Sequence, residues 1–365
     1  MRQEYTTSPH ERLAHRLDEA PLGAPRGPEL MAILEALFSR AEAELAAEVP
    51  VGKPISLGVL AERLGRPAGE LAPILEGMAD RGLCYQRLTS KGAYYSLLPV
   101  VPGMAETQFL GGGTGEDKRH LARLFAAYYR PGLGRSLVEA GAPYSRVIPV
   151  GRAVRNSQEI LPFEQAENVL RGAGSLALGN CFCRHEAELM GHGCGAPKDV
   201  CLIFGPFAEF AVRKGFARAA DLNTAMNALE RAEMAGLVHV TDNVANGASF
   251  MCNCCGCCCM FLKTITQLKA PGAVSQAGWL AVVDQDNCTG CGQCREICQV
   301  EAPQAQDEAM AVDPALCLGC GQCALACPTG AIEMQRRQRP RPPAAPPDLM
   351  NALASARAEK PTARS

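Results

Sequence analysis

Aromatic residues are scarce in this 365-residue chain, at 5% with a single tryptophan, although 47% of its residues are hydrophobic. A hydrophobic fraction of this size excludes disorder of the whole chain. Basic residues number 36 and acidic residues 38. This near-balance argues against general nucleic-acid binding, because proteins that bind nucleic acid usually have an excess of basic residues. No apolar run reaches the roughly 18 residues of a transmembrane helix. The first residues lack the apolar core of a signal peptide, which predicts a cytoplasmic chain without membrane insertion.

Cysteine, by contrast, is abundant. Of the 19 cysteines, Cys84 stands alone, ten lie between Cys181 and Cys259, and eight lie between Cys288 and Cys327. A chain of this length buries a core without disulfide bonds. The odd total and the tight spacings also disfavour a secreted disulfide scaffold. Metal ligation is therefore the better interpretation of most of these cysteines.

Changes of pattern predict an α+β multidomain protein. Residues 1–27 are polar and interrupted by proline and glycine, which predicts a flexible leader. Residues 28–110 show helical periodicity followed by a hairpin pattern, and they resemble a winged-helix domain in the order and length of their elements. The predicted elements are helices over 28–38, 56–65 and 67–81 and strands over 83–88 and 93–98.

The third of these helices weighs against DNA binding. It carries Glu70, Glu76 and Asp80 against the single Arg81, and carboxylates that face phosphates are unfavourable. The sequence therefore favours a structural or partner-docking role for this domain, and nucleic acid is not an expected partner.

Residues 116–270 alternate helical and strand patterns, which predicts a central mixed α/β domain rich in cysteine. Cys181 and Cys252 stand at the ends of predicted strands, where loops commonly carry functional groups. Residues 335–365 are rich in proline, alanine and arginine, which predicts a disordered tail. The predicted central elements are helices over 116–129, 163–171 and 221–235 and strands over 145–151, 175–181, 237–240 and 248–252.

Eight cysteines form two runs with the same spacing, C-x₂-C-x₂-C-x₃-C, at Cys288–Cys298 and Cys317–Cys327. Each cysteine of the first run recurs 29 positions later, as does Val283-Asp284, so the segment is an internal duplication. Three closely spaced thiolates in a turn can hold three corners of an iron–sulfur cubane, and the fourth, on the helix that follows, points to a second cluster. Zinc sites normally use paired C-x₂-C knuckles that lie farther apart.

Residues 279–334 resemble the bacterial two-cluster ferredoxins, a resemblance that rests on these two runs. It implies a ferredoxin-like fold with one [4Fe–4S] cluster on Cys288, Cys291, Cys294 and Cys327. It implies a second [4Fe–4S] cluster on Cys317, Cys320, Cys323 and Cys298. The first run departs from the family pattern at Gln299, where proline is usual, and at Glu301, where glycine is usual. These departures concern the local turn, because all eight ligands are present.

The ten central cysteines form a second group. The segment Cys-Phe-Cys-Arg-His begins at Cys181, and six cysteines then occupy eight positions from Cys252 to Cys259. Thiols packed this closely without a metal would be prone to oxidation. The group therefore predicts at least one further metal site, with an iron–sulfur cluster favoured over zinc, and leaves open which cysteines bind. The candidate ligands are Cys181, Cys183, Cys194, Cys201, Cys252, Cys254, Cys255, Cys257, Cys258 and Cys259.

Three functions fit these features. The first is an iron–sulfur electron-transfer protein that works with redox partner proteins. The second is an electron-feeding subunit, or an enzyme whose active centre is the central cysteine group. The third is a redox-sensing winged-helix regulator. No flavin, nicotinamide or phosphate-binding motif accompanies the cysteines, and Gly111–Gly115 lacks the Gly-Lys-Ser/Thr ending of a phosphate loop. The whole pattern is similar to that of uncharacterised ferredoxin-type proteins of anaerobic bacteria.

Overall fold

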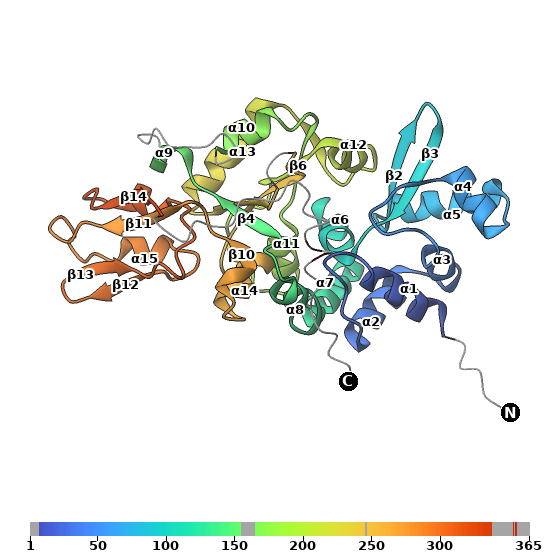
Figure 1. Ribbon diagram of the computed structural model, residues 1–365, viewed down its shortest axis with the longest axis horizontal. Helices are drawn as coiled ribbons and strands as arrows, with labels where there is room; N and C mark the ends of the chain where they lie inside the picture. The colour runs from blue at the N-terminus through green and yellow to red at the C-terminus, as the bar shows by residue number, and fades with distance from the viewer. Residues whose placement is uncertain (1–6, 155–164, 245–246, 338–352, 354, 356–365) are drawn as a thin grey trace.

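The computed structural model describes residues 7–154, 165–244, 247–337, 353 and 355. The N-terminal helices and hairpin lie at one end of the long axis, the strands β11–β14 lie at the other, and the central sheet lies between them (Figure 1). One continuous core of buried side chains extends from Leu13 in the first helix to Ile332 in the last strand. The three parts are therefore packed together through hydrophobic contacts.

The N-terminal part contains the three helices and two strands that the sequence predicts for residues 28–98. Ser56 caps the second predicted helix by accepting a hydrogen bond from the Val59 N–H, and Gly65 ends that helix in the left-handed conformation. The strands pair in the order β1-β3-β2. The elements are α1 (Pro9–Asp18), α2 (Pro28–Leu37), α3 (Arg40–Ala46), β1 (Ile55–Ser56), α4 (Leu57–Leu64), α5 (Ala68–Asp80), β2 (Cys84–Thr89) and β3 (Gly92–Leu97).

Part of the predicted flexible leader is ordered. Residues 9–18 form α1, which begins with a capping box between Ser8 and Glu11. Leu13 and Leu17 on its inner face are fully buried in the core. The prediction is wrong for this stretch, because burial of this face offsets the entropy cost of ordering the helix. Residues 1–6 lie outside the described residues.

Helix α5, the third predicted helix, packs against the central domain. Lys214 is the C-terminal cap residue of α12 (Gly205–Arg213). Its ammonium group lies 2.6 Å from a carboxylate oxygen of Glu76 and 2.6 Å from one of Asp80. The Lys214 side chain is 8% exposed. Two of the acidic residues on α5 therefore hold it against the rest of the chain. The winged-helix assignment itself stays a prediction.

The central domain is built on a seven-stranded sheet in the order β10-β4-β8-β9-β6-β5-β7. Only β10 and β4 pair in parallel, and the other neighbours are antiparallel. The strands are β4 (Ser145–Ile148), β5 (Leu176–Gly179), β6 (Cys201–Phe204), β7 (Arg218–Ala220), β8 (Val238–Asp242), β9 (Phe250–Cys254) and β10 (Val274–Ser275). The sheet thus extends past residue 270, where the sequence predicts the domain to end.

The helices that accompany this sheet include the predicted ones at 116–129 and 221–235, whereas the sequence does not predict α11 and α12. Helix α10 covers the second half of the predicted 163–171 helix, and Phe163 lies outside the described residues. The helices are α6 (Ala105–Leu110), α7 (Glu116–Tyr128), α8 (Arg135–Glu139), α9 (Gly151–Val154), α10 (Ala166–Arg171), α11 (Phe182–Leu189), α12, α13 (Leu222–Met234) and α14 (Met260–Thr266), with short helical turns η1 (Val100–Met104), η2 (Tyr129–Gly134) and η4 (Pro271–Ala273).

The C-terminal module consists of two copies of one unit. Each unit has a short helix inside its cysteine run, which carries the third cysteine and ends just before the fourth. The two strand pairs are β11–β14 and β12–β13. The repeat extends to single hydrogen bonds, because the Asp284 N–H donates to Ala331 as the Asp313 N–H donates to Ala302. The elements are β11 (Trp279–Val283), α15 (Gln293–Ile297), β12 (Pro303–Gln306), β13 (Ala309–Val312), α16 (Gln322–Ala326) and β14 (Ile332–Arg336).

The start of the predicted disordered tail is also ordered. Gln335 and Arg336 belong to β14, and the Arg337 backbone N–H donates a hydrogen bond to Gly278. Leu353 is fully buried in the core. The prediction is therefore wrong for these positions, and most of residues 338–365 lie outside the described residues.

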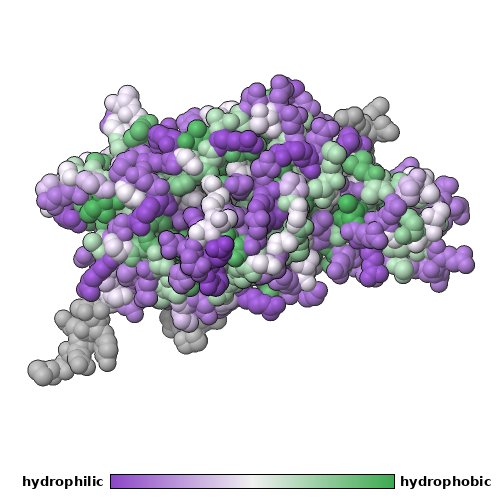
Figure 2. Space-filling view, turned by 180° about the vertical axis from the view of Figure 1, so that it is seen from behind, coloured by the Kyte–Doolittle hydropathy of each residue, from purple (hydrophilic) through white to green (hydrophobic). Residues whose placement is uncertain are grey.

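Hydrophilic residues dominate the face of the molecule seen in Figure 2, and hydrophobic residues are scattered among them. No helix within the described ranges is both long and apolar enough to cross a membrane.

Candidate metal centres

The structure brings together the inner quartet of the C-terminal module, which is Cys298, Cys317, Cys320 and Cys323. These four cysteines line one cavity together with apolar side chains such as Val238 and Val300. The Ala302 N–H donates to the Cys298 sulfur at 3.4 Å. Burial raises the pKa of Cys320 to about 12. Apolar surroundings and backbone N–H donors to sulfur are typical of a protein site for an iron–sulfur cluster.

The outer quartet lies closer to solvent. Cys288 and Cys291 are electrostatic neighbours of Cys294, and Cys291 is exposed. Its fourth predicted member, Cys327, receives backbone hydrogen bonds from the segment that follows it, as Cys298 does in the first unit. The two quartets are adjacent, because Cys294 and Cys323 are electrostatic neighbours.

The glycines of the two runs are required by their conformation. Gly290 and Gly319, at equivalent positions, have φ of 65° and 71°. A Cβ atom would lie 2.5 Å from the Glu308 oxygen at the first position and 2.2 Å from the Trp279 oxygen at the second. Side chains are therefore excluded at both turns, which lie between the first and the second cysteine of each run.

In the central domain, three neighbouring strand ends bring the cysteines to one edge of the sheet. Gly179, at the end of β5, pairs with Cys201 at the start of β6. Leu202 pairs with Met251, so the register places Cys201 beside Cys252 of β9. Strands β5, β6 and β9 are consecutive in the sheet, although they are far apart in the sequence. All ten predicted central ligands therefore lie around this edge and the loops that leave it.

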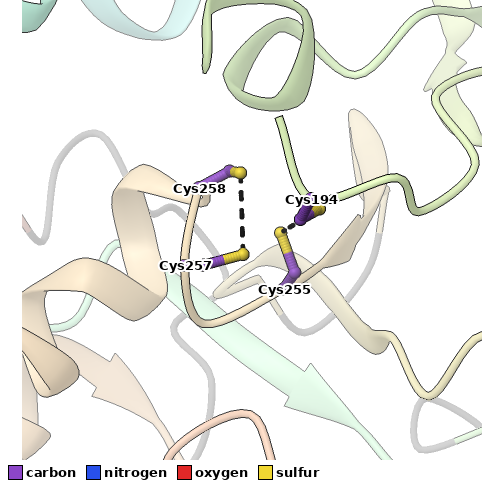
Figure 3. A group of neighbouring side chains, drawn as sticks. All are labelled: Cys194, Cys255, Cys257 and Cys258. Atoms are coloured by element: carbon purple, nitrogen blue, oxygen red, sulfur yellow. Dashed lines mark hydrogen bonds between the residues drawn. The ribbon is translucent and has the colours of Figure 1, made fainter. Parts of the chain in front are cut away.

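Four of the ten form one compact group. The sulfur atoms of Cys194, Cys255, Cys257 and Cys258 all lie within 4.8 Å of one another. Three of these residues come from the loop between β9 and α14, and Cys194 reaches them from the segment after α11 (Figure 3). The sulfur of Cys194 lies 3.8 Å from that of Cys255, and the sulfur of Cys257 lies 3.6 Å from that of Cys258. The hydrogen bond from Cys258 lowers the pKa of Cys255 and so favours the metal-binding thiolate.

The other six central cysteines lie beside this group and form a second set of neighbouring thiols. They are Cys181, Cys183, Cys201, Cys252, Cys254 and Cys259. Cys181 and Cys259 each stand directly before a helix, α11 and α14. The Met260 N–H donates to the Cys183 sulfur at 3.4 Å, so backbone donors face this set as well.

Arg184 lies between the two sets and was not among the residues that the sequence predicts as ligands. Its side chain is buried, with 2% exposure, and one guanidinium nitrogen donates to the Asn253 carbonyl oxygen at 2.7 Å. The same nitrogen atom lies 4.0 Å from the Cys255 sulfur. Burial opposes the charge of Arg184, but the surrounding cysteines raise its pKa overall. The guanidinium therefore supplies a buried positive charge next to the thiolates.

The Asn253 side chain fixes the strand that carries Cys252 and Cys254. Asn253 lies between them, donates to the Val200 oxygen at 2.6 Å and contacts a His239 ring nitrogen at 2.5 Å.

His185, which stands next to Arg184, has its ring nitrogens 3.0 Å and 2.9 Å from the carbonyl oxygens of Phe109 and Gly113. Both ring nitrogens of His185 are thus engaged by the backbone, which argues against a ligand role.

Gln299 connects the C-terminal module to the central cysteines. Its side-chain oxygen accepts a hydrogen bond from the Gly256 N–H at 2.9 Å, and its side-chain nitrogen donates to the Gly236 oxygen at 3.0 Å. Gln299 follows Cys298, and Gly256 stands between Cys255 and Cys257. Gln299 stands where proline is usual in the family. Its amide group makes both hydrogen bonds, and proline has no side-chain group that could make them.

The same interface has two further hydrogen bonds. The Gln322 side chain donates to the Leu237 oxygen at 2.7 Å, and the Val150 N–H donates to the Cys320 oxygen at 2.8 Å. The inner quartet therefore faces the central domain, since Val238 of that domain lines the same cavity.

Comparison with known proteins supports the C-terminal sites. Residues 281–304 and 310–333 each match the family of 4Fe-4S binding domains. Neither a curated protein nor a solved structure has a significant match to the chain. The chain thus carries a ferredoxin-type 4Fe-4S region at its C-terminal end, and the paired motifs indicate two [4Fe–4S] clusters, which fit the residues present. The compact central group is a candidate for an additional metal centre.

Proposed function

We propose that the protein is an electron-transfer protein whose ferredoxin module exchanges single electrons with a metal centre in the central domain. A [4Fe–4S] cluster supplies a group that takes up and releases one electron without breaking bonds. The outer quartet, with Cys291 exposed, is the entry side for an electron from a reduced partner protein. The inner quartet faces the central domain, which then passes the electron to an oxidised acceptor.

The observation that carries this proposal is the contact between Gln299 and Gly256. It joins the residue after Cys298 of the inner quartet to the residue between Cys255 and Cys257 of the compact group. One hydrogen bond thereby links two segments that bear predicted ligands. A module that only diffuses between partners has no need for such a fixed connection to a second cysteine site.

The regulator hypothesis has less support. Glu76 and Asp80 of α5 are held by Lys214 of the central domain, so this helix is engaged in packing within the chain. We propose that residues 28–110 serve as a structural or partner-docking domain and that the protein acts in the cytoplasm.

An enzyme with its centre at the compact group differs from a carrier by substrate turnover, which a Cys257→Ser variant would abolish.

Replacing Gln299 with alanine is expected to slow electron transfer from the ferredoxin module to the central domain by about tenfold, equal to about 1.4 kcal/mol in activation free energy. The variant loses both hydrogen bonds of the amide but keeps every cysteine. The measurement is rapid-freeze electron paramagnetic resonance after addition of one electron equivalent to the anaerobic protein, with iron content as a check on loading.

The matched control is Gln322→Ala, which removes a hydrogen bond at the same interface but does not touch the loop from Cys254 to Cys259. Wild-type rates in both variants would show that the Gln299 contact carries no electrons. If no electron reaches the central domain even in the wild-type protein, the proposed function itself is wrong.

A further inference from the structure

The six central cysteines outside the compact group form a ring of neighbouring thiols. Successive members are neighbours in the order Cys201, Cys252, Cys254, Cys259, Cys183 and Cys181. Cys181 is in turn an electrostatic neighbour of Cys201, which closes the ring. Four of the six side chains are at most 8% exposed, and the other two are partly buried. Neighbouring thiols without a bound metal would be prone to oxidation, so this set is expected to bind one.

The spacing of the ring does not fit a single ion. Zinc bound by four sulfurs at about 2.3 Å holds them about 3.8 Å apart, and the compact group has this spacing. Among the described residues, the compact group is the one set of three or more potential ligands that all lie within 4.8 Å of one another. Neither in the ring nor in either ferredoxin quartet do three sulfur atoms all lie within 4.8 Å of one another. A polynuclear cluster needs such spacing, because its iron and sulfide atoms lie between the ligands.

Arg184 provides a second, independent indication of a ligand. Its Nε and Nη2 atoms are buried and have no hydrogen-bond partner in the described structure. The electrostatic neighbours of this guanidinium include Cys181 and Cys254 of the ring. A buried donor without an acceptor costs about 1–3 kcal/mol, so such groups are rarely left unsatisfied. Inorganic sulfide is an anionic acceptor that would fit beside these thiolates.

We propose that the ring holds a polynuclear iron–sulfur cluster, distinct from the two ferredoxin clusters, and that Arg184 donates hydrogen bonds to its sulfide. The compact group of Cys194, Cys255, Cys257 and Cys258 holds a separate single metal ion. This inference rests on the proposed function in one respect, the source of the electrons that reach the ring cluster. The loop from Cys254 to Cys259 carries cysteines of both sets and contacts Gln299, so it is the place where electrons from the ferredoxin module arrive. The electron that arrives there is one that the ferredoxin module received from its donor protein.

Paired substitutions test this division. Cys201→Ser with Cys252→Ser opens the ring, and Cys257→Ser with Cys258→Ser opens the compact group. Iron, zinc and acid-labile sulfide are counted on anaerobically purified, reconstituted full-length protein. The ring pair is expected to lose about four iron atoms with their sulfide, whereas the compact pair loses one ion and no sulfide. The losses are expected to add when all four substitutions are combined.

Two further variants make the outcome decisive. Cys181→Ser with Cys183→Ser opens the ring from α11 and must give the same loss of sulfide if the ring is one site. Cys84→Ser, at a buried cysteine bonded to the Ser96 oxygen, must change no metal count. Unchanged sulfide in both ring variants would overturn the proposal, as would losses from the ring and compact pairs that are identical and not additive.

The ferredoxin signals separate this inference from the proposed function. If the ring variants lose sulfide while the ferredoxin signals remain, the ring cluster exists whatever its electron source. If the metal counts support the ring but no electron passes from the ferredoxin module, the proposed function fails and the metal site stands.

Discussion

Replacing Gly256 with alanine is expected to detach the ferredoxin module from the central cysteine loop. A Cβ atom at this position would lie 1.9 Å from the backbone oxygen of Gln299. A backbone atom cannot move away as the end of a flexible side chain can, so the two segments must separate. Overpacking of this kind costs about 1–3 kcal/mol or more. Limited proteolysis of the junction near Gln276 and the rate of electron transfer to the central domain measure the effect.

Gly151→Ala is the matched control, because Gly151 lies near the contact between Val150 and Cys320 but has open space around its Cα atom. Combining Gly256→Ala with Gln299→Ala is a second control. Removing the amide does not relieve a clash with a backbone oxygen, so the double variant is expected to remain detached. A Gly256→Ala protein with wild-type protease resistance and wild-type electron transfer would contradict the close contact.

Replacing Arg184 with methionine is expected to lower the reduction potential of the ring cluster. A reduced cluster carries one more negative charge, so the buried guanidinium stabilises the reduced form more than the oxidised form. Each 1.4 kcal/mol of lost stabilisation corresponds to about 60 mV for a one-electron couple. Methionine keeps much of the side-chain volume but supplies neither the charge nor the hydrogen bond to Asn253. A redox titration monitored by electron paramagnetic resonance measures the shift.

Arg184→Lys keeps the positive charge and is expected to shift the potential less than methionine does, although it lacks the forked geometry. The ferredoxin potentials serve as internal references, because the cysteines that raise the pKa of Arg184 most belong to the central domain. An unchanged or higher potential in Arg184→Met would show that the guanidinium does not face a redox centre.

The ferredoxin module is the part that the sequence predicts most completely. Its ligands lie within two short runs, so local spacing determines which thiols meet, and Gly290 and Gly319 mark the turns. The duplication also predicts the equivalent hydrogen bonds of Asp284 and Asp313. The pairing of Cys298 with the second run follows from the resemblance, and the cavity it shares with Cys317 and Cys320 agrees with that pairing.

The division of the ten central cysteines into two sets is not predictable from the sequence. It depends on strand β6 lying between β5 and β9, a non-local arrangement that the register of Leu202 against Met251 fixes. Cys254 and Cys255 are adjacent in the chain, yet they enter different sets because the strand ends between them and the loop begins.

Two other features of the structure have signals in the sequence. The Ser8 and Glu11 pair before an apolar helical face is typical of a helix start, and it marks α1 within the predicted leader. Gln299 breaks the family pattern at one position, and the structure gives this residue two hydrogen bonds to the central domain. In both cases a local irregularity in the sequence coincides with a tertiary contact.

The most direct test of the account is the iron and sulfide content of the anaerobically purified wild-type protein, determined together with its electron paramagnetic resonance spectrum. Two ferredoxin clusters contribute about 8 iron atoms, and the ring cluster raises the total to about 12, with sulfide in matching amount. We therefore expect about 12 iron atoms and a reducible signal beyond those of the ferredoxin module. A total of about 8 or fewer, with a central domain free of iron and sulfide, would contradict it.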